Sequence, residues 1–427
     1  MLLVAMAALC GAAAAPGQHP PKNIAGEETP VKIEIVDPAA VGGTFHSHNQ
    51  KVLRNGGGTF LTYNEKGHWY LLRSADGGRT FETVYRSAER TAPPPIETDS
   101  EDRVYLAYGV AEGVKFLRFS PANGYTSPDM TKVYQGSFGG GKFAMAYDPG
   151  RGQFYYASRG GYVLTIDKAG HLLRTQRVWQ RDPKDTGPQY PHLFVDADGT
   201  LHHAMTMTPS DNKPWYDLIR YVKSTDGAAN WQAMNGTALS IPTSCGVKGP
   251  STLITLPDGG ESTLYNTWLC NMHPKAGKVH FYYRAEVPGA DRIHYMRFDA
   301  RTGKREIDSW TDRNNEFKGE TISFASLFGA FASDPEDPAG PLYFVSLDKN
   351  SRNLAALVSF DSGSTWQDYA RATVELWDRG TVSRVGCSVR LTPDGKVIGS
   401  FKATKGGIQQ VFYFQFPALL PKRALAR

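Results

Sequence analysis

Ser74-Ala75-Asp76-Gly77-Gly78-Arg79-Thr80-Phe81 is the stretch that decides the fold, because it returns twice in altered form: SFDSGSTW at residues 359–366 keeps its pattern, and STDGAANW at 224–231 is a degraded copy that keeps the Ser, the Asp, a Gly and the terminal aromatic. In the shared pattern S-x-D-x-G-x-T-[FW], the Asp side chain can accept hydrogen bonds from turn amides, and Gly allows a positive φ where the chain reverses. The terminal aromatic can pack into the layer beneath. A strand-like run precedes each copy, so the octets predict three turns between paired strands.

The rest of the chain consists of short β-rich runs separated by D-G, N-G and G-G turns, and no long amphipathic helical stretch competes with them. The gaps between the three octets each fit about three repeats of roughly 45 to 50 residues. The sequence therefore predicts an all-β fold, a single β-propeller of four-stranded blades over residues 31–418. We expect seven blades, with six or eight as the alternatives. The run at 31–36 (VKIEIV) is expected to close the ring against the last blade.

The amino-acid composition agrees with this fold and limits the classes of molecule that the protein is expected to bind. Aromatic residues make up 12% of the 427-residue chain, with 44 Gly and 27 Pro, which favours a turn-rich β protein. The net charge is +5 and the sequence has no basic tract, so nothing in it indicates nucleic-acid binding. A mildly basic surface suits an acidic polysaccharide. We expect a monomer.

The first residues predict export. Residues 1–15 (MLLVAMAALCGAAAA) read as a secretory signal peptide, followed by a disordered lead-in at 16–30, and residues 419–427 read as a tail. No later apolar run reaches the ~20 residues of a membrane span. The protein is therefore expected to be secreted or periplasmic.

Three cysteines remain in the mature chain. Either Cys245 and Cys270 bridge neighbouring strands and leave Cys387 free, or all three are buried thiols. No spacing indicates zinc, and no cofactor is expected, although a loop could hold a structural calcium ion.

Candidate chemistry gathers where strands begin or end, since the sites of propellers are built from loops of several blades. The richest cluster is His46, His48, Asn49 and Gln50, which offers proton transfer and oxygen recognition, and His68 begins a later strand of the same blade. A single histidine of this kind is equally typical of a surface loop.

Three further segments carry candidate side chains. One is the segment from Gln189 to His192, which contains Tyr190; the others are a strand with Tyr155 that ends at Arg159, and a strand that ends at Arg284. Such an Arg can hold a carboxylate through two hydrogen bonds. Alternating tyrosines in strands are more often core residues.

The three octets resemble the Asp-box (BNR) repeats of sialidase-like β-propellers. True sialidases carry an Arg-Ile-Pro segment ahead of the first Asp-box, and the segment from Val31 to Arg73 contains none. The first of their three substrate-clamping arginines is therefore missing.

A second resemblance is to BNR-4 repeat proteins, carried by residues 189–202 (QYPHLFVDADGTLH), 216–227 (YDLIRYVKSTDG) and 231–242 (WQAMNGTALSIP). Members include seven-bladed ulvan and rhamnose–glucuronate lyases and a related rhamnosidase. In such lyases a His/Tyr pair does acid/base work on a uronate while an Arg or His neutralises its carboxylate.

The resemblance implies roles for particular residues. His48 and His68 look like the paired histidines, Tyr190 or Tyr155 like the tyrosine, and Arg159 like the neutralising group. His46, Asn49, Gln50, His192 and Arg284 are then expected to bind substrate.

The sequence thus predicts an exported enzyme that cleaves a uronate-containing polysaccharide by β-elimination. One alternative is a sialidase-like or rhamnosidase-like hydrolase, which needs two facing carboxylates, with Glu97, Asp99, Asp217 and Glu320 as candidates. Another is a non-catalytic propeller that binds glycan or protein.

Overall fold

The computed structural model describes residues 31–44, 49–135, 141–180, 187–208, 216, 218–245, 252, 254, 265–287, 290–311, 317–318, 329–348, 353–373 and 376–419. Several predictions fall outside these residues. They are the signal peptide, the lead-in, most of the tail, His46, His48, Asp217 and Glu320.

Within the described residues the regular elements are β-strands and one 3-10 helix, η1 (Pro121–Asn123), as the alternating sequence predicts. Three sheets have four strands in chain order. They are β2 (Val52–Asn55), β3 (Gly58–Glu65), β4 (His68–Ser74) and β5 (Glu82–Arg90); β6 (Ile96–Thr98), β7 (Val104–Val110), β8 (Gly113–Phe119) and β9 (Asp129–Gln135); and β10 (Phe143–Asp148), β11 (Gln153–Ser158), β12 (Tyr162–Asp167) and β13 (Leu172–Arg177).

Two sheets have five strands, and a short parallel pair lies beside them. They are β15 (Gly187–Val195), β16 (Leu201–Thr208), β17 (Leu218–Ser224), β18 (Trp231–Gln232) and β19 (Ala238–Leu239); β21 (Tyr265–Lys275), β22 (Lys278–Val287), β23 (Ala290–Asp299), β24 (Arg305–Thr311) and β25 (Phe317–Lys318); and the pair β14 (Trp179–Gln180) with β20 (Thr243–Ser244). Residues 189–192, one of the candidate segments, lie inside β15.

The last sheet contains strands from both ends of the chain. It comprises β26 (Ala330–Ser333), β27 (Leu342–Leu347), β28 (Leu354–Ser359), β29 (Gln367–Ala372), β1 (Val31–Val41), β32 (Ile408–Pro417), β31 (Lys396–Lys405) and β30 (Ser383–Cys387). Strand β1 pairs antiparallel with β32 and parallel with β29. The first described strand therefore joins the last part of the chain, as the VKIEIV run predicts.

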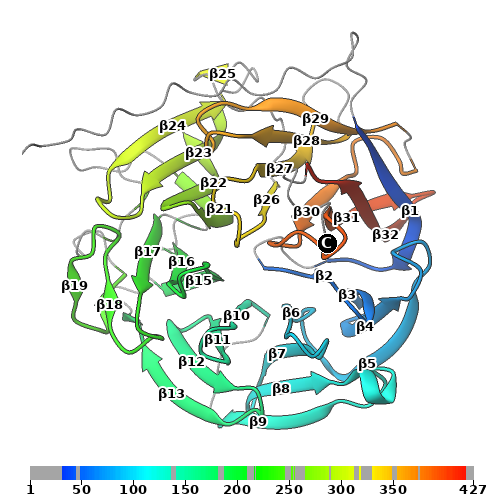
Figure 1. Cartoon of the computed structure of the whole chain (residues 1–427), viewed down its shortest axis with the longest axis horizontal. Coiled ribbons are helices and arrows are strands. Elements are labelled where there is room, and N and C mark those ends of the chain that lie inside the picture. Colours follow the sequence, from blue (N-terminus) through cyan, green and yellow to red (C-terminus); the bar gives the residue numbers. More distant parts are fainter. Residues whose placement is uncertain are drawn as a thin grey trace, which may run out of the picture.

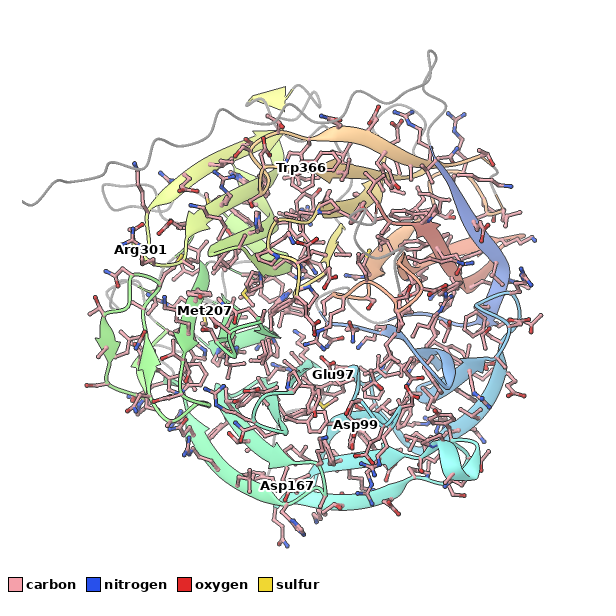
Figure 2. The ribbon with its side chains drawn as sticks, viewed as in Figure 1. Glu97, Asp99, Asp167, Met207, Arg301 and Trp366 are labelled. Atoms are coloured by element: carbon pink, nitrogen blue, oxygen red, sulfur yellow. The ribbon has the colours of Figure 1, made fainter. Side chains whose placement is uncertain are left out.

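The sheets stand around a common centre, and the strands nearest to it are β2, β6, β10, β15, β21, β26 and β30, whereas β1 lies on the outside (Figure 1). Side chains fill the space between neighbouring sheets; for example, the ring centroids of Tyr105 in β7 and Phe154 in β11 lie 4.5 Å apart. In Figure 2, Glu97 lies towards the centre of the ring, and Asp167 lies at its rim. Packing between sheets, rather than within one sheet, thus makes the core of this propeller-like fold.

The three octets form the predicted turns, each between the third and fourth strand of its sheet. In the third copy, Asp361 Oδ1 accepts the Thr365 amide at 2.8 Å and Oδ2 accepts its hydroxyl at 2.7 Å. Ser359 Oγ accepts the Gly363 amide at 2.7 Å and donates to Asp361 at 2.8 Å. The first and second copies repeat these bonds around Asp76 and Asp226.

The aromatic residue of each octet contacts the preceding sheet in the ring. Phe81 packs on Tyr413 at 5.3 Å between ring centroids, and Trp366 packs on Tyr295 at 5.8 Å. Trp231 donates its indole N–H to Gln176 Oε1 at 3.0 Å. A Cβ on Gly363, which has a φ of +81°, would lie 2.0 Å from the Tyr295 hydroxyl. The octets therefore fasten neighbouring sheets as well as reversing the chain.

The three cysteines are all buried free thiols, which decides between the two alternatives for Cys245 and Cys270. No helix in the described part of the chain is long and apolar enough to cross a membrane.

Candidate functional site

One end of the ring gathers cationic and aromatic side chains from four sheets. In an antiparallel sheet the start of the first strand, the end of the second and the start of the third lie at the same end. Lys142 directly precedes β10, Arg159 follows β11, and Tyr216 lies just ahead of β17. Early positions of β15, β21 and β30 add Tyr190, Trp268 and Arg384. These six residues are called the Lys142 end below.

Lys142 and two tyrosines form a connected group at this end. Lys142 Nζ donates to Gln189 Oε1 at 2.9 Å and to the Tyr216 hydroxyl at 3.4 Å. The hydroxyls of Tyr190 and Tyr216 lie 2.8 Å apart. Lys142 Nζ also lies 3.9 Å from the centroid of the Tyr190 ring, a cation–π distance. The backbone fixes this arrangement, because the Arg159 amide donates to the Lys142 carbonyl at 3.3 Å.

Trp268 extends the aromatic surface. Its ring centroid lies 5.1 Å from that of Tyr190 and 6.1 Å from that of Tyr216, and the Arg384 guanidinium lies 5.0 Å from its centroid. Such rings offer flat apolar faces beside polar tips. Arg384 adopts a φ of +57°, a conformation that costs a non-glycine residue free energy and is often found at functional sites.

Burial and the repulsion between like charges shift the pKa values of side chains at the Lys142 end. Burial lowers the pKa of Lys142 to about 8, with the Arg159 charge adding to the effect. Burial also lowers the pKa of Arg384. Burial raises the pKa of the Tyr190 phenol, and its hydrogen bond to Tyr216 raises it further. Among the described residues, no carboxylate forms an ion pair with Lys142 or Arg159. The end therefore attracts a ligand that brings its own negative charge.

The sequence predicted two members of this group, Tyr190 and Arg159, and the structure brings them together with each other. It missed Lys142, Tyr216, Trp268 and Arg384. Lys142, Trp268 and Arg384 come from different strands and belong to no motif quoted above, whereas Tyr216 opens the segment 216–227 that carries the BNR-4 resemblance and was not singled out there.

Other predicted residues lie elsewhere. Tyr155 is fully buried, and its hydroxyl donates to Asp148 Oδ2 at 3.2 Å. His192 is buried further along β15, and burial lowers its pKa to about 3. His68 Nδ1 lies 3.0 Å from the Ser87 carbonyl of the outermost strand β5. The contacts of Tyr155 and His68 named here do not involve the Lys142 end.

The side chains of Asn49 and Gln50 form hydrogen bonds to the inner strands of the ring. The Asn49 amide donates to the Phe143 carbonyl. Gln50 Nε2 donates to Ile96 O at 2.8 Å, and its Oε1 accepts the Val389 amide at 2.8 Å. Gln50 thus ties three neighbouring sheets together. Arg284, half-buried, lies opposite Trp268 in the β21–β22 ladder, next to the Lys142 end.

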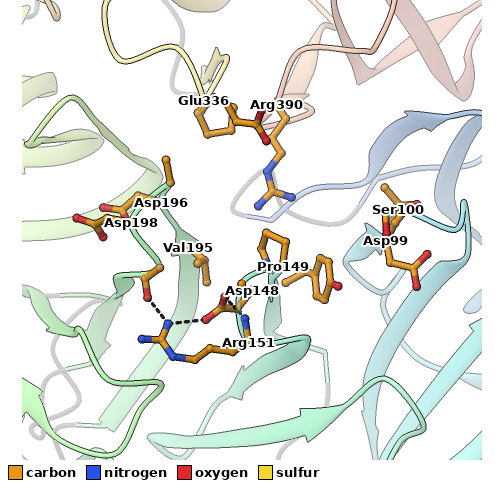
Figure 3. A pocket seen from close by; sticks show the side chains of 16 residues that line it. Asp99, Ser100, Asp148, Pro149, Arg151, Val195, Asp196, Asp198, Glu336 and Arg390 are labelled. Carbon is orange, nitrogen blue, oxygen red and sulfur yellow. Dashed lines mark hydrogen bonds and ion pairs between the residues drawn. The ribbon is translucent and has the colours of Figure 1, made fainter.

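The opposite end of the ring carries a pocket of about 570 Å³ lined by turns that join first to second strands. We call it the Asp148 end, defined by Asp99, Asp148, Arg151, Asp196 and Arg390. Figure 3 shows Arg390 projecting into this pocket, with Asp148 bound to Arg151.

The acids of the Asp148 end are occupied by their own turns. Asp148 accepts the Arg151 amide at 3.0 Å and the Arg151 guanidinium at 2.8 Å. Asp99 accepts the Tyr105 hydroxyl at 2.9 Å. Asp196 lies 2.9 Å from His202 Nε2. These contacts stabilise turns, as Asp does in Asx-turns.

Glu97 and Asp99, the candidate hydrolytic acids that the structure describes, both belong to this half of the molecule. Glu97 is buried, burial raises its pKa to about 7, and Arg390 Nη1 lies 3.5 Å away. No group of three or more His, Cys, Asp or Glu suited to a metal ion occurs among the described residues.

No protein-family model and no curated protein sequence matches the chain. Among solved structures, an ulvan lyase of polysaccharide lyase family PL25, bound to -[GlcA(1-4)Rha3S]-, is similar with a TM-score of 0.63 and 13% identity, over 88% of this chain and 95% of the lyase. Polysaccharide lyase Uly1 is similar with a TM-score of 0.60 and 10% identity, over 92% of this chain and all of that one. At such identities the likeness shows a shared propeller-like fold.

Proposed function

We propose that this protein is an exported enzyme that cleaves a uronate-containing polysaccharide by β-elimination at the Lys142 end. The observation that carries the proposal is the excess of positive charge around a hydrogen-bonded tyrosine pair, with no ion-paired carboxylate at Lys142 or Arg159 among the described residues. An anionic sugar supplies the missing charge, and the rings of Tyr190 and Trp268 offer it flat faces.

The proposed fold is a propeller of seven blades. The eight-stranded sheet divides at the parallel β29–β1 contact into β26–β29 and β1 with β30–β32. With the five other sheets of four or five strands, this division makes seven units. The similar lyase structures support the same architecture.

Elimination needs three things from the protein. The uronate carboxylate must be neutralised so that the proton on C5 becomes acidic; Arg159, exposed and beside Lys142, is the group we assign to this task. A base must take that proton, and an acid must return one to the leaving oxygen on C4. The Tyr190–Tyr216 pair provides hydroxyls for these transfers. His48, which the resemblance implies as a partner, lies outside the described residues.

The reaction balances without a co-reactant. The C5–H bond breaks and its proton passes to a phenolate oxygen, a C4–C5 double bond forms, and the C4–O bond breaks with a proton passing to the departing sugar. The substrate of the ulvan lyase in its solved complex, a glucuronate-containing chain, supports this choice of class.

The test is ultraviolet absorbance during incubation with a panel of uronate polysaccharides, because elimination leaves a conjugated unsaturated uronate and hydrolysis does not. The matched substrate is the same polymer with its carboxylates reduced to alcohols. We expect absorbance to rise only with the acidic polymer. New reducing ends without absorbance would show a hydrolase, and binding without cleavage would show a glycan-binding propeller.

A further inference from the structure

The phenol oxygen of Tyr216 lies between two hydrogen-bond donors. Lys142 Nζ approaches it at 3.4 Å, and the Tyr190 hydroxyl lies 2.8 Å away. A phenolate in this position could accept both bonds, and hydrogen bonds to a charged form favour that form. Donors fixed in advance around an oxygen stabilise negative charge without rearranging during the reaction.

The Lys142 ammonium is held by contacts within the protein. Its ammonium contacts the Gln189 amide oxygen, the Tyr216 oxygen and the face of the Tyr190 ring. The side chain is half-buried. A bound carboxylate would have to displace these contacts, whereas the Arg159 side chain is exposed and forms no hydrogen bond or ion pair with the described residues.

Tyr190 keeps the proton that it can donate to Tyr216. Only 5% of the residue is exposed, and burial raises the pKa of its phenol, so it stays neutral. Tyr216 is the more exposed member of the pair. The hydroxyl that can meet a substrate is thus the one that receives two donors.

Among the described residues, three cations near Tyr216 favour an anion at its oxygen. Lys142 contacts it ahead of β10, and the Arg384 charge on β30 is felt at both tyrosines. Arg159, after β11, acts on Lys142 and Tyr190. Trp268 of β21 is uncharged.

We propose that Tyr216 is the catalytic base, and that Lys142 and Tyr190 are positioning residues that hold its phenolate between two donors. This inference rests on the proposed function for its substrate. In the step it describes, the Tyr216 oxygen takes the C5 proton, and the phenol so formed returns that proton to the departing oxygen on C4. Lys142 keeps its own proton throughout, so Lys142 needs positive charge but not the ability to lose a proton.

The kinetic test uses two substitutions of one residue and a matched control. Lys142→Met should move the rising limb of the pH profile of kcat/KM upward by about one pH unit, since an opposite charge at this distance stabilises a phenolate by about that much. Lys142→Arg should restore most of the shift, because an Arg keeps its proton. Lys168→Met is the control, since Lys168 lies 5.7 Å from the Tyr147 ring at the Asp148 end.

Two outcomes would overturn the inference. An inactive Lys142→Arg would mean that the lysine amine itself takes the proton. An unmoved profile in Lys142→Met would mean that the lysine serves only packing.

A measurement without turnover separates this inference from the proposed function. In protein labelled with ¹³C at tyrosine Cζ, the resonance that disappears in Tyr216→Phe reports ionisation of that phenol. We expect its titration to move to higher pH in Lys142→Met and to stay in place in Lys168→Met. An unchanged titration in Lys142→Met refutes the arrangement even if the protein proves to be a lyase.

Discussion

The two ends of the ring use charge in opposite ways. At the Asp148 end Asp99, Asp148 and Asp196 each accept a backbone amide from their own turn, and Asp148 also accepts the Arg151 guanidinium. At the Lys142 end Lys142 contacts neutral oxygens and an aromatic face, and within the part of the chain that the structure describes neither Lys142 nor Arg159 forms an ion pair with a carboxylate. A satisfied turn holds a fold together, and an unsatisfied cluster of like charges costs stability, which a protein tolerates where a ligand brings the opposite charge.

The largest expected effect comes from removing a tyrosine hydroxyl at the Lys142 end, compared with removing one at the Asp148 end. Tyr216→Phe should lower kcat by about 10²- to 10⁴-fold, because general-base catalysis contributes about that factor. Tyr155→Phe, which removes the bond to Asp148, should leave kcat unchanged. Steady-state kinetics on a uronate polymer measure both. An equal fall in kcat in the two variants would contradict the assignment of catalysis to the Lys142 end.

Removing an acid from the Asp148 end should affect stability alone. Asp148→Asn weakens the contacts to Arg151 and Tyr155, and losing a buried charged partner costs about 1–3 kcal/mol of unfolding free energy. Urea unfolding gives the change, and kcat/KM should match the wild type. A large fall in kcat/KM with normal stability would assign catalysis to this end instead.

Acid should weaken the part of the fold between the two ends. Burial lowers the pKa of His192, His203 and His273 to about 3, 4 and 3, so these rings stay neutral in the folded protein. The unfolded chain binds protons below roughly pH 6.5, so stability is lost as pH falls through that value, by about 1 kcal/mol per histidine per pH unit.

Urea unfolding at a series of pH values measures this loss. His192→Gln should reduce the slope of stability against pH. An unchanged slope would show that His192 charges at no cost inside the ring.

The smallest effect is expected in an octet. Ser359→Ala removes the hydroxyl that binds the Gly363 amide and Asp361, a loss of about 1 kcal/mol. The octet turns lie at the same end as Asp148, since Arg151 donates to the Thr225 carbonyl at 2.9 Å. The midpoint temperature of thermal unfolding should fall by a few degrees, and kcat/KM should equal that of the wild type. A change in kcat/KM would mean that the ends are coupled.

Local patterns predicted the fold well. The octets contain the turn acceptor, the flexible Gly and the packing aromatic within eight residues, so their hydrogen bonds could be read before the structure. Alternating apolar residues predicted the strands in the same way. The blade number stays a prediction, because it depends on how distant strands group.

The candidate site was only half predictable, because it is assembled from distant strands. Tyr190 and Arg159 were recognised from their place near a strand end. Tyr155 sits in an equally promising sequence, but the direction of its side chain puts its hydroxyl on Asp148. Lys142 and Tyr216 are 74 residues apart in the chain, and only the ring of sheets brings them within 3.4 Å.

The most direct test of the account compares two arginines, Arg159 at the Lys142 end and Arg151 at the Asp148 end. Each would be changed to Met, and kcat/KM would be measured by unsaturated-uronate absorbance on one acidic polymer. The account predicts a loss of about 10- to 100-fold in Arg159→Met, equivalent to one charge-assisted contact of about 1.5–3 kcal/mol, and wild-type activity in folded Arg151→Met. A loss confined to Arg151→Met, or the same loss in both, would contradict the assignment of the active site to the Lys142 end.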